Sequence, residues 1–202
     1  MSARMSEGRA HAVFMDRDGV LNEDLGYVSR PEDFHWLPGA VQALRWLRRA
    51  GWRLVIVTNQ GGIARGLYGP AEYDNVTSWM QSELAKQDVR FDGIYHCPHL
   101  RDAPLAAWRR QCACRKPLPG MLLRAARELG LDLASSVMVG DKPSDIAAGR
   151  AAGLAACIRV ADTAPTPAAL AALAAAQVPD YTCASLAEAA YWLLSHQIER
   201  RA

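Results

Sequence analysis

Lysine is scarce in this sequence of 202 residues. The chain has 23 basic residues, but lysine occurs only at Lys86, Lys116 and Lys142. The basic residues are nearly balanced by 21 acidic ones, which gives a net charge of +2. That balance argues against a nucleic-acid or membrane surface built on bulk charge. It also raises the question of why a chain that uses arginine elsewhere keeps lysine at these three positions.

Long apolar runs, an export signal and linkers are lacking as well. No apolar stretch approaches the roughly 20 residues that span a bilayer, and residues 1–12 have no apolar core of the kind found in signal peptides. Without repeats or linkers, we expect one domain over residues 1–202. We also expect a cytoplasmic protein and, since no heptad or extra interface element is present, a monomer.

Short apolar runs alternate with helical patterns along the chain. The runs predict buried strands at residues 12–15, 52–57, 91–95, 137–139 and 154–160. The helical patterns predict one helix that begins at 38–39 and ends at 51, a second that begins at 70, and three more over 119–129, 143–152 and 186–197. Segment 163–178 is rich in alanine and proline. The alternation predicts an α/β fold with a parallel, Rossmann-like sheet covered by helices on both faces.

Polar residues follow three of the predicted strands: Asp16 and Asp18, Thr58 and Asn59, and Asp141. Ligands of open α/β sheets bind beyond the carboxyl ends of the strands, so these groups should meet at one edge together with Lys116 and Lys142. Clustered carboxylates repel one another unless a cation intervenes, and oxygen ligands suit Mg²⁺. A lysine there supplies a compact charge for phosphate oxygens. Asp145 could equally face the first turn of its own helix.

Three of the five cysteines cluster in one segment, residues 97–114. Cys97 and His99 open it and Cys112 and Cys114 close it, which offers three thiolates and one imidazole. Four such ligands form a closed tetrahedral set for structural Zn²⁺, with no open position for a catalytic water. His96 is a competing ligand on spacing alone.

Four segments resemble the four motifs of the haloacid dehalogenase superfamily of phosphohydrolases. They are DRDGVLN at 16–22, VTN at 57–59, RKP at 115–117 and VGDKPSD at 139–145. They occur in the order of the superfamily's motifs and, with the preceding strand, span residues 13–145. The resemblance implies a Rossmann-like phosphatase domain, here without a large cap.

The resemblance also implies roles for the motif residues. Asp16 would attack phosphorus and become an aspartyl phosphate, and Asp18 would act as general acid and base. Thr58 and Lys116 would hold the transferring phosphoryl oxygens. Asp141 would bind Mg²⁺ together with the Asp16 carboxylate and the Asp18 backbone carbonyl.

The zinc segment without a cap resembles a small group of phosphatases that act on heptose bisphosphate or histidinol phosphate. Segments 24–28, 58–60, 62–66 and 114–121 look most like the heptose enzymes, which remove the C7 phosphate of heptose 1,7-bisphosphate in ADP-heptose and lipopolysaccharide biosynthesis. Gly61 departs from the serine often found there but leaves its backbone amide. The implied substrate contacts are Asp24, Leu25, Gly26, Tyr27, Thr58, Asn59, Gln60, Gly61, Arg115, Lys116 and Lys142.

Charge separates the alternative substrates. A bisphosphate needs positive groups for the phosphate that is not cleaved, and Arg115 or Arg65 could supply them. Histidinol phosphate carries an amine, for which Glu23 or Asp24 could serve. A third alternative is a zinc-stabilised binding protein without turnover, which would require the loss of a motif residue, and none is missing.

Overall fold

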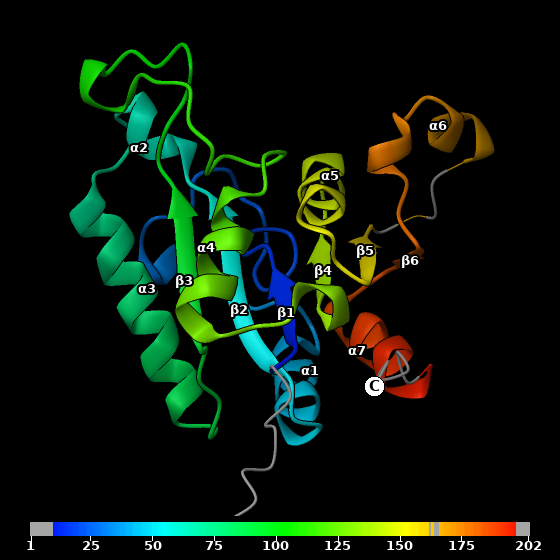
Figure 1. Cartoon of the computed structure of the whole chain (residues 1–202). Coiled ribbons are helices and arrows are strands. Elements are labelled where there is room, and N and C mark those ends of the chain that lie inside the picture. Colours follow the sequence, from blue (N-terminus) through cyan, green and yellow to red (C-terminus); the bar gives the residue numbers. More distant parts are fainter. Residues whose placement is uncertain (1–9, 162, 164–165, 197–202) are drawn as a thin grey trace, which may run out of the picture.

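The computed structural model describes residues 10–161, 163 and 166–196, and these contain a parallel sheet of six strands. The strands are β1 (Ala12–Met15), β2 (Arg53–Asn59), β3 (Gly93–Cys97), β4 (Val137–Gly140), β5 (Ala156–Val160) and β6 (Tyr181–Cys183). Their order is β3-β2-β1-β4-β5-β6, and every neighbouring pair is parallel (Figure 1). The α/β prediction is confirmed.

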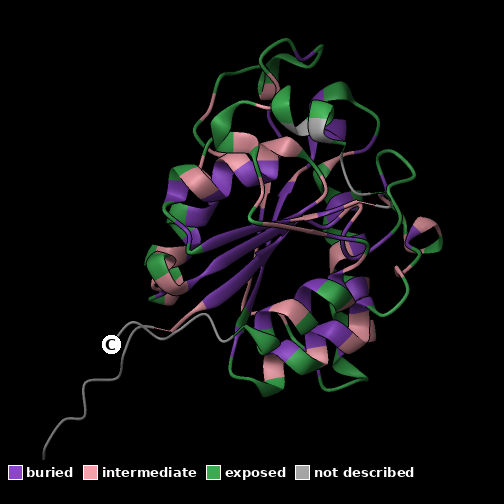
Figure 2. Cartoon of the chain, turned by 90° about the vertical axis from the view of Figure 1, so that its right-hand side faces the viewer, coloured by how far each residue is buried: buried purple, intermediate pink, exposed green. Residues whose placement is uncertain are grey.

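Helices cover both faces of this sheet. The described helices are α1 (Ala40–Arg49), α2 (Gly61–Arg65), α3 (Pro70–Ala85), α4 (Gly120–Leu129), α5 (Pro143–Ala152), α6 (Pro167–Ala171) and α7 (Leu186–Ser195), with short 3₁₀ turns η1 (Pro31–Asp33), η2 (Ala106–Trp108), η3 (Leu133–Ser135) and η4 (Ala175–Gln177). One core cluster joins the sheet to α1, α3 and α7, and a second joins it to α4 and α5. Figure 2 shows the buried strands lying between these helical layers.

The continuous apolar runs follow from burial on both faces. In β1, Val13 and Met15 belong to the first cluster, while Ala12 and Phe14 belong to the second. Successive side chains of a strand point to opposite faces, so a central strand with helices on both sides needs apolar residues at every position. All four residues of β1 are fully buried.

The predicted boundaries differ from the structure at several places. The strand expected at 91–95 lies at Gly93–Cys97, and the one expected at 154–160 begins at Ala156. Three helices or strands were missed: α2, five residues that begin with two glycines, α6, five residues in the segment rich in alanine and proline, and β6, three residues at the edge of the described sheet beside β5. None of them is long enough to show a period in the sequence. The helix expected over 186–197 ends at Ser195, and residue 197 lies outside the described residues.

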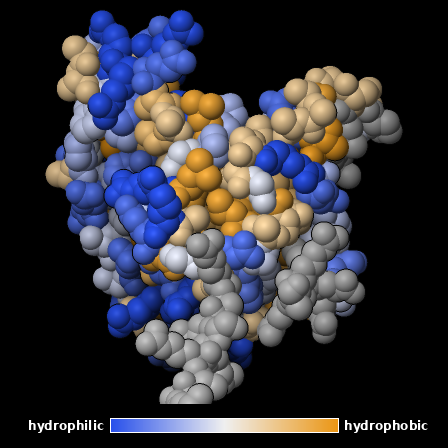
Figure 3. All heavy atoms as spheres, in the orientation of Figure 1, coloured by the Kyte–Doolittle hydropathy of each residue, from blue (hydrophilic) through white to orange (hydrophobic). Residues whose placement is uncertain are grey.

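In the sheet, β2 lies on one side of β1 and β4 lies on the other, so the order in which strands are added changes direction at β1. Such a switch point is where open α/β sheets bind ligands. Figure 3 shows that the face seen in Figure 1 mixes hydrophilic and apolar side chains. None of the described helices is long and apolar enough to cross a membrane.

Candidate functional site

A cavity of about 410 Å³ lies beyond the carboxyl ends of β1 and β2. Its lining residues are Asp16, Asp18, Asp24, Gly26, Tyr27, Thr58, Asn59, Gln60, Gly61, Tyr68, Arg115, Lys116, Lys142, Ser144 and Asp145. The predicted catalytic side chains and nearly all predicted substrate contacts therefore surround one space. The predicted magnesium ligand Asp141 lines an adjoining cavity of about 640 Å³, which shares Asp24 with the first.

Leu25 is the predicted substrate contact that the structure leaves out of this lining. Its side chain is 56% exposed. The Gly26 N–H donates to Asp24 Oδ1 over 3.1 Å, and Gly26 has a φ of +74°. This tight turn directs its flanking residues into the cavity and leaves Leu25 facing solvent.

Lys116 is buried between two carboxylates. Its Nζ lies 3.0 Å from Asp16 Oδ2 and 2.6 Å from Asp145 Oδ1, and it donates to the Val57 carbonyl over 2.8 Å. Burial by itself would lower the pKa of Lys116, but Asp16 and Asp145 together raise it above its ordinary value. The site therefore holds a fixed positive charge directly beside the Asp16 carboxylate.

The amide of Asn59 fixes the main chain at Lys116. Asn59 Nδ2 donates to the Lys116 carbonyl and the Lys116 N–H donates to Asn59 Oδ1, both over 3.1 Å. Asn59 was predicted to contact substrate, and in the structure its side chain is engaged in holding the lysine. It thereby joins the end of β2 to the loop before α4.

Four N–H donors surround the carboxylate of Asp18. Arg17 reaches Oδ1 with Nε at 3.1 Å and Nη2 at 2.9 Å, Asn22 Nδ2 reaches Oδ1 at 3.0 Å, and Gln60 Nε2 reaches Oδ2 at 3.1 Å. Arg17 is 2% exposed and also donates to the Val28 carbonyl. Sequence reasoning missed Arg17, although an arginine between two strand-end aspartates was a visible signal. Paired guanidinium bonds hold a carboxylate in one orientation.

The carboxylates of Asp16, Asp141 and Asp145 lie close enough together to hold a metal ion, with one oxygen of each within 4.8 Å of the others. Asp141 Oδ1 is buried without a hydrogen-bond partner among the described residues. Burial and the charge of Asp16 raise the pKa of Asp141 to about 6. Gly19, with a φ of +81°, permits this crowding, because a Cβ there would lie 2.7 Å from Asp141 Oδ2. The oxygen donors and the unpaired atom fit Mg²⁺.

Asp145 serves its own helix and the cavity at once. Its Oδ2 accepts the Lys142 N–H over 2.9 Å at the start of α5, while its Oδ1 pairs with Lys116. The carboxylate is fully buried. Burial raises the pKa of Asp145 although Lys116 opposes the rise. Asp16 and Asp141 stay the predicted carboxylate ligands of the magnesium ion, and Asp145 is a third carboxylate close to the same position.

Two further cations reach the cavity from other elements. Lys142 Nζ lies 2.9 Å from Asp24 Oδ2 and 3.4 Å from Asp141 Oδ2, so it joins the 24–27 turn to the end of β4. Arg115 Nη1 donates to the His99 carbonyl over 3.2 Å. Arg65, the predicted alternative to Arg115, is exposed and does not line this cavity.

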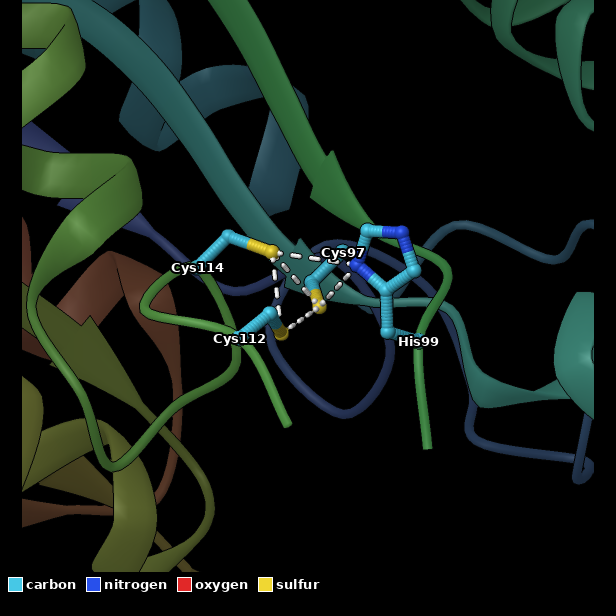
Figure 4. Close-up of side chains that lie close together, drawn as sticks. All are labelled: Cys97, His99, Cys112 and Cys114. Atoms are coloured by element: carbon cyan, nitrogen blue, oxygen red, sulfur yellow. Dashed lines mark hydrogen bonds between the residues drawn. The ribbon is translucent and has the colours of Figure 1, made fainter. Parts of the chain in front are cut away.

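The four predicted zinc ligands meet at the end of β3 (Figure 4). The sulfur–sulfur distances are 3.5 Å for Cys97–Cys112, 3.0 Å for Cys97–Cys114 and 3.2 Å for Cys112–Cys114. His99 Nδ1 faces two of the sulfurs, at 3.4 Å from Cys114 and 3.7 Å from Cys97. Ligands about 2.0–2.3 Å from a tetrahedral zinc ion lie at comparable separations. The donor set therefore fits a closed structural Zn²⁺ site.

His96 is excluded from this set by its place on β3. Its ring lies against that of Tyr73, with the centroids 4.1 Å apart and the ring planes tilted by 41°. His96 and Cys97 are adjacent in the strand, so their side chains point to opposite faces of the sheet. Spacing left both His96 and His99 as candidate zinc ligands, and the alternation of side chains along β3 decides for His99.

Replacing Cys112 by serine should release the zinc ion and lower the melting temperature by about 5 °C or more, the shift that corresponds to a loss of about 2 kcal/mol in a domain of this size. Elemental analysis and thermal unfolding measure the two effects. Cys183→Ser is the matched control, because Cys183 is a buried cysteine of the main core. Unchanged zinc content in Cys112→Ser would contradict the assigned ligand set.

Comparison with known proteins places the chain in a family. A sequence profile of haloacid dehalogenase-like hydrolases matches residues 9–150. D-glycero-beta-D-manno-heptose-1,7-bisphosphate 7-phosphatases are 48% identical over 143 residues, which is 71% of this chain, in Yersinia pestis (76% of that protein) and Escherichia coli strain K12 (75%).

A solved structure agrees with these sequence relatives. The crystal structure of a D,D-heptose 1,7-bisphosphate phosphatase from B. bronchiseptica, complexed with magnesium and phosphate, is 37% identical to this chain. It superposes with a TM-score of 0.78 and covers 92% of this chain and 99% of its own. The profile, the relatives and the fold agree, and the chain belongs to the haloacid dehalogenase-like hydrolases.

Proposed function

We propose that this chain is a magnesium-dependent phosphatase that removes the C7 phosphate of D-glycero-D-manno-heptose 1,7-bisphosphate, in ADP-heptose and lipopolysaccharide core biosynthesis. One observation carries the proposal. A single cavity holds the Asp16 carboxylate against the buried cation Lys116, at 3.0 Å, and receives two more cations, Lys142 and Arg115. The relatives named for this reaction share about half of their aligned residues with the chain.

The cavity residues divide the reaction between them. Asp16 attacks the phosphorus, the bond from phosphorus to the C7 oxygen breaks, and Asp18 gives its proton to the departing alcohol. Asp18 then takes a proton from the water that cleaves the aspartyl phosphate. Lys116 and Thr58 hold the phosphoryl oxygens in both steps. A magnesium ion held by Asp16 and Asp141 would neutralise the charge that builds up on those oxygens.

Charge in the cavity favours a bisphosphate over histidinol phosphate. Arg115 lines the cavity and forms no ion pair among the described residues, so its charge is available for the phosphate that is not cleaved, whereas Lys142 would exchange its pair with Asp24 for that phosphate. The amine of histidinol phosphate would find fewer free carboxylates here. Asp24 is already paired with Lys142 at 2.9 Å, and Glu23 lines the adjoining cavity. The hydrogen bond and charge of Lys142 outweigh burial and lower the pKa of Asp24. Histidinol phosphate is the second candidate because the cleavage chemistry is the same.

The test compares kcat/KM for the two substrates on one preparation with Mg²⁺, followed by release of inorganic phosphate. We expect the heptose bisphosphate to be preferred about a hundredfold or more, which corresponds to roughly 2.7 kcal/mol of differential transition-state binding. A preference for histidinol phosphate would overturn the proposed substrate but would leave the proposed mechanism unchanged. Absence of hydrolysis of both substrates and of p-nitrophenyl phosphate would instead favour the non-catalytic binding protein. One domain over residues 1–202, a monomer and a cytoplasmic location stay predictions.

A further inference from the structure

Gln60 lies at the junction of two catalytic groups. Its side chain is buried at the end of β2, where it is the residue before α2. Nε2 donates to Thr58 Oγ1 over 2.9 Å and to Asp18 Oδ2 over 3.1 Å. Oε1 accepts the hydroxyl of Tyr68. The amide thus uses both N–H groups and its carbonyl, which is its full donor set and an acceptor.

The direction of this chain of hydrogen bonds has a chemical consequence. Thr58 Oγ1 accepts from Gln60, so the hydroxyl proton of Thr58 is left to donate elsewhere, and Thr58 lines the cavity. If the amide of Gln60 turned over, its carbonyl would take that proton and would also face the Asp18 carboxylate. An amide can adopt either orientation, and its partners decide which one is populated.

We propose that Tyr68 is a positioning residue that holds Gln60 in this orientation, so that Thr58 donates to the transferring phosphoryl group. This inference rests on the proposed phosphatase reaction. The Asp18 carboxylate only accepts and therefore selects the N–H end of the amide, and Tyr68 donates to the carbonyl at the other end. Its removal leaves that carbonyl buried without its donor, so the amide, and with it the Thr58 hydroxyl, is held less firmly.

The ring of Tyr68 is closely packed by its neighbours. The ring is 8% exposed and packs with Ile63 and Tyr73. A Cβ on Gly62 would lie 2.1 Å from Tyr68 Cε1, so the glycine in α2 is what lets the ring approach. The hydroxyl is therefore held against Gln60 by packing on several sides.

The experiment compares Tyr68→Phe with Tyr73→Phe, using release of phosphate from the heptose bisphosphate with Mg²⁺. Tyr73 is the matched control, because its ring belongs to the same cluster and is 3% exposed, while its hydroxyl is not bonded to Gln60, Thr58 or Asp18. We expect Tyr68→Phe to lower kcat about tenfold, equivalent to about 1.4 kcal/mol, with KM nearly unchanged and the melting temperature lowered by only a few degrees, because the buried Gln60 carbonyl loses its donor. Tyr73→Phe should stay within twofold of the wild type. Equal kcat values for the two variants would overturn the proposal.

A second comparison shows whether the effect passes through the amide. In a Gln60→Met background the acceptor is gone, so adding Tyr68→Phe should change kcat by less than about twofold. A further tenfold loss in that background would mean that Tyr68 acts by another route and would also overturn the proposal. If the wild type hydrolyses p-nitrophenyl phosphate but not the heptose bisphosphate, the proposed function fails while the same variants still test Tyr68 on the aryl phosphate.

Discussion

Asp16→Asn should abolish phosphate release, with kcat at least about 10⁴-fold below the wild type, because a neutral amide does not form the phosphoryl-enzyme bond. The fold should survive the change. The carboxamide oxygen of the variant can still accept the Arg17 N–H, which Asp16 Oδ1 accepts at 2.8 Å, and Lys116 keeps its pair with Asp145. Steady-state kinetics measure the loss, and an intact-mass measurement of quenched protein should find the phosphorylated species in the wild type alone.

Stability separates this effect from unfolding. Asp16→Asn removes the repulsion between Asp16 and Asp141 but also one of the two carboxylates paired with Lys116, so the two effects oppose each other and the melting temperature without metal should change by about 5 °C or less. Asp33→Asn is the control, because Asp33 is an exposed partner of Arg30 and does not line the cavity. Substantial hydrolysis by Asp16→Asn would refute the assignment of the nucleophile.

Lys116→Arg should lower kcat/KM at least about a hundredfold, and Lys86→Arg should stay within about twofold of the wild type. The side chain of Lys116 is 1% exposed and its Nζ meets Asp16, Asp145 and the Val57 carbonyl. A guanidinium is larger and planar, so it overfills this space and displaces the charge from the phosphoryl oxygens. Lys86, the residue that follows α3, pairs on the surface with Glu83.

Lys116→Met provides the complementary measurement. It removes the cation and leaves two buried carboxylates without their partner, so we expect a loss of about 3–5 kcal/mol in the free energy of unfolding, measured by denaturant titration. Lys116→Arg keeps a positive charge and should lose less stability than this while still losing activity. Equal activity losses for the Lys116 and Lys86 arginine variants would defeat the explanation of why lysine is kept at position 116.

The motif residues and the zinc ligands could be predicted because each depends on a local pattern. Asp16 and Thr58 follow apolar strands directly, and parallel strands bring their carboxyl ends to one edge. Cys112 and Cys114 are two residues apart in the loop that follows Cys97 and His99, so four ligands can meet without any distant element. The family and the α/β architecture, both predicted from these patterns, are confirmed.

What the sequence by itself determined was which groups gather at the site, since strand ends and loop spacing are local properties. Only the tertiary structure decided how those groups are held. The structure extends β3 to Cys97, past the expected end at residue 95, and so turns His96 away from the zinc ligands. Packing against Gly62 brings Tyr68 to Gln60, and Asn59 bonds to the main chain of Lys116, 57 positions away. These contacts depend on side-chain direction and on the distance between separate elements. No period or spacing along the chain encodes either of them.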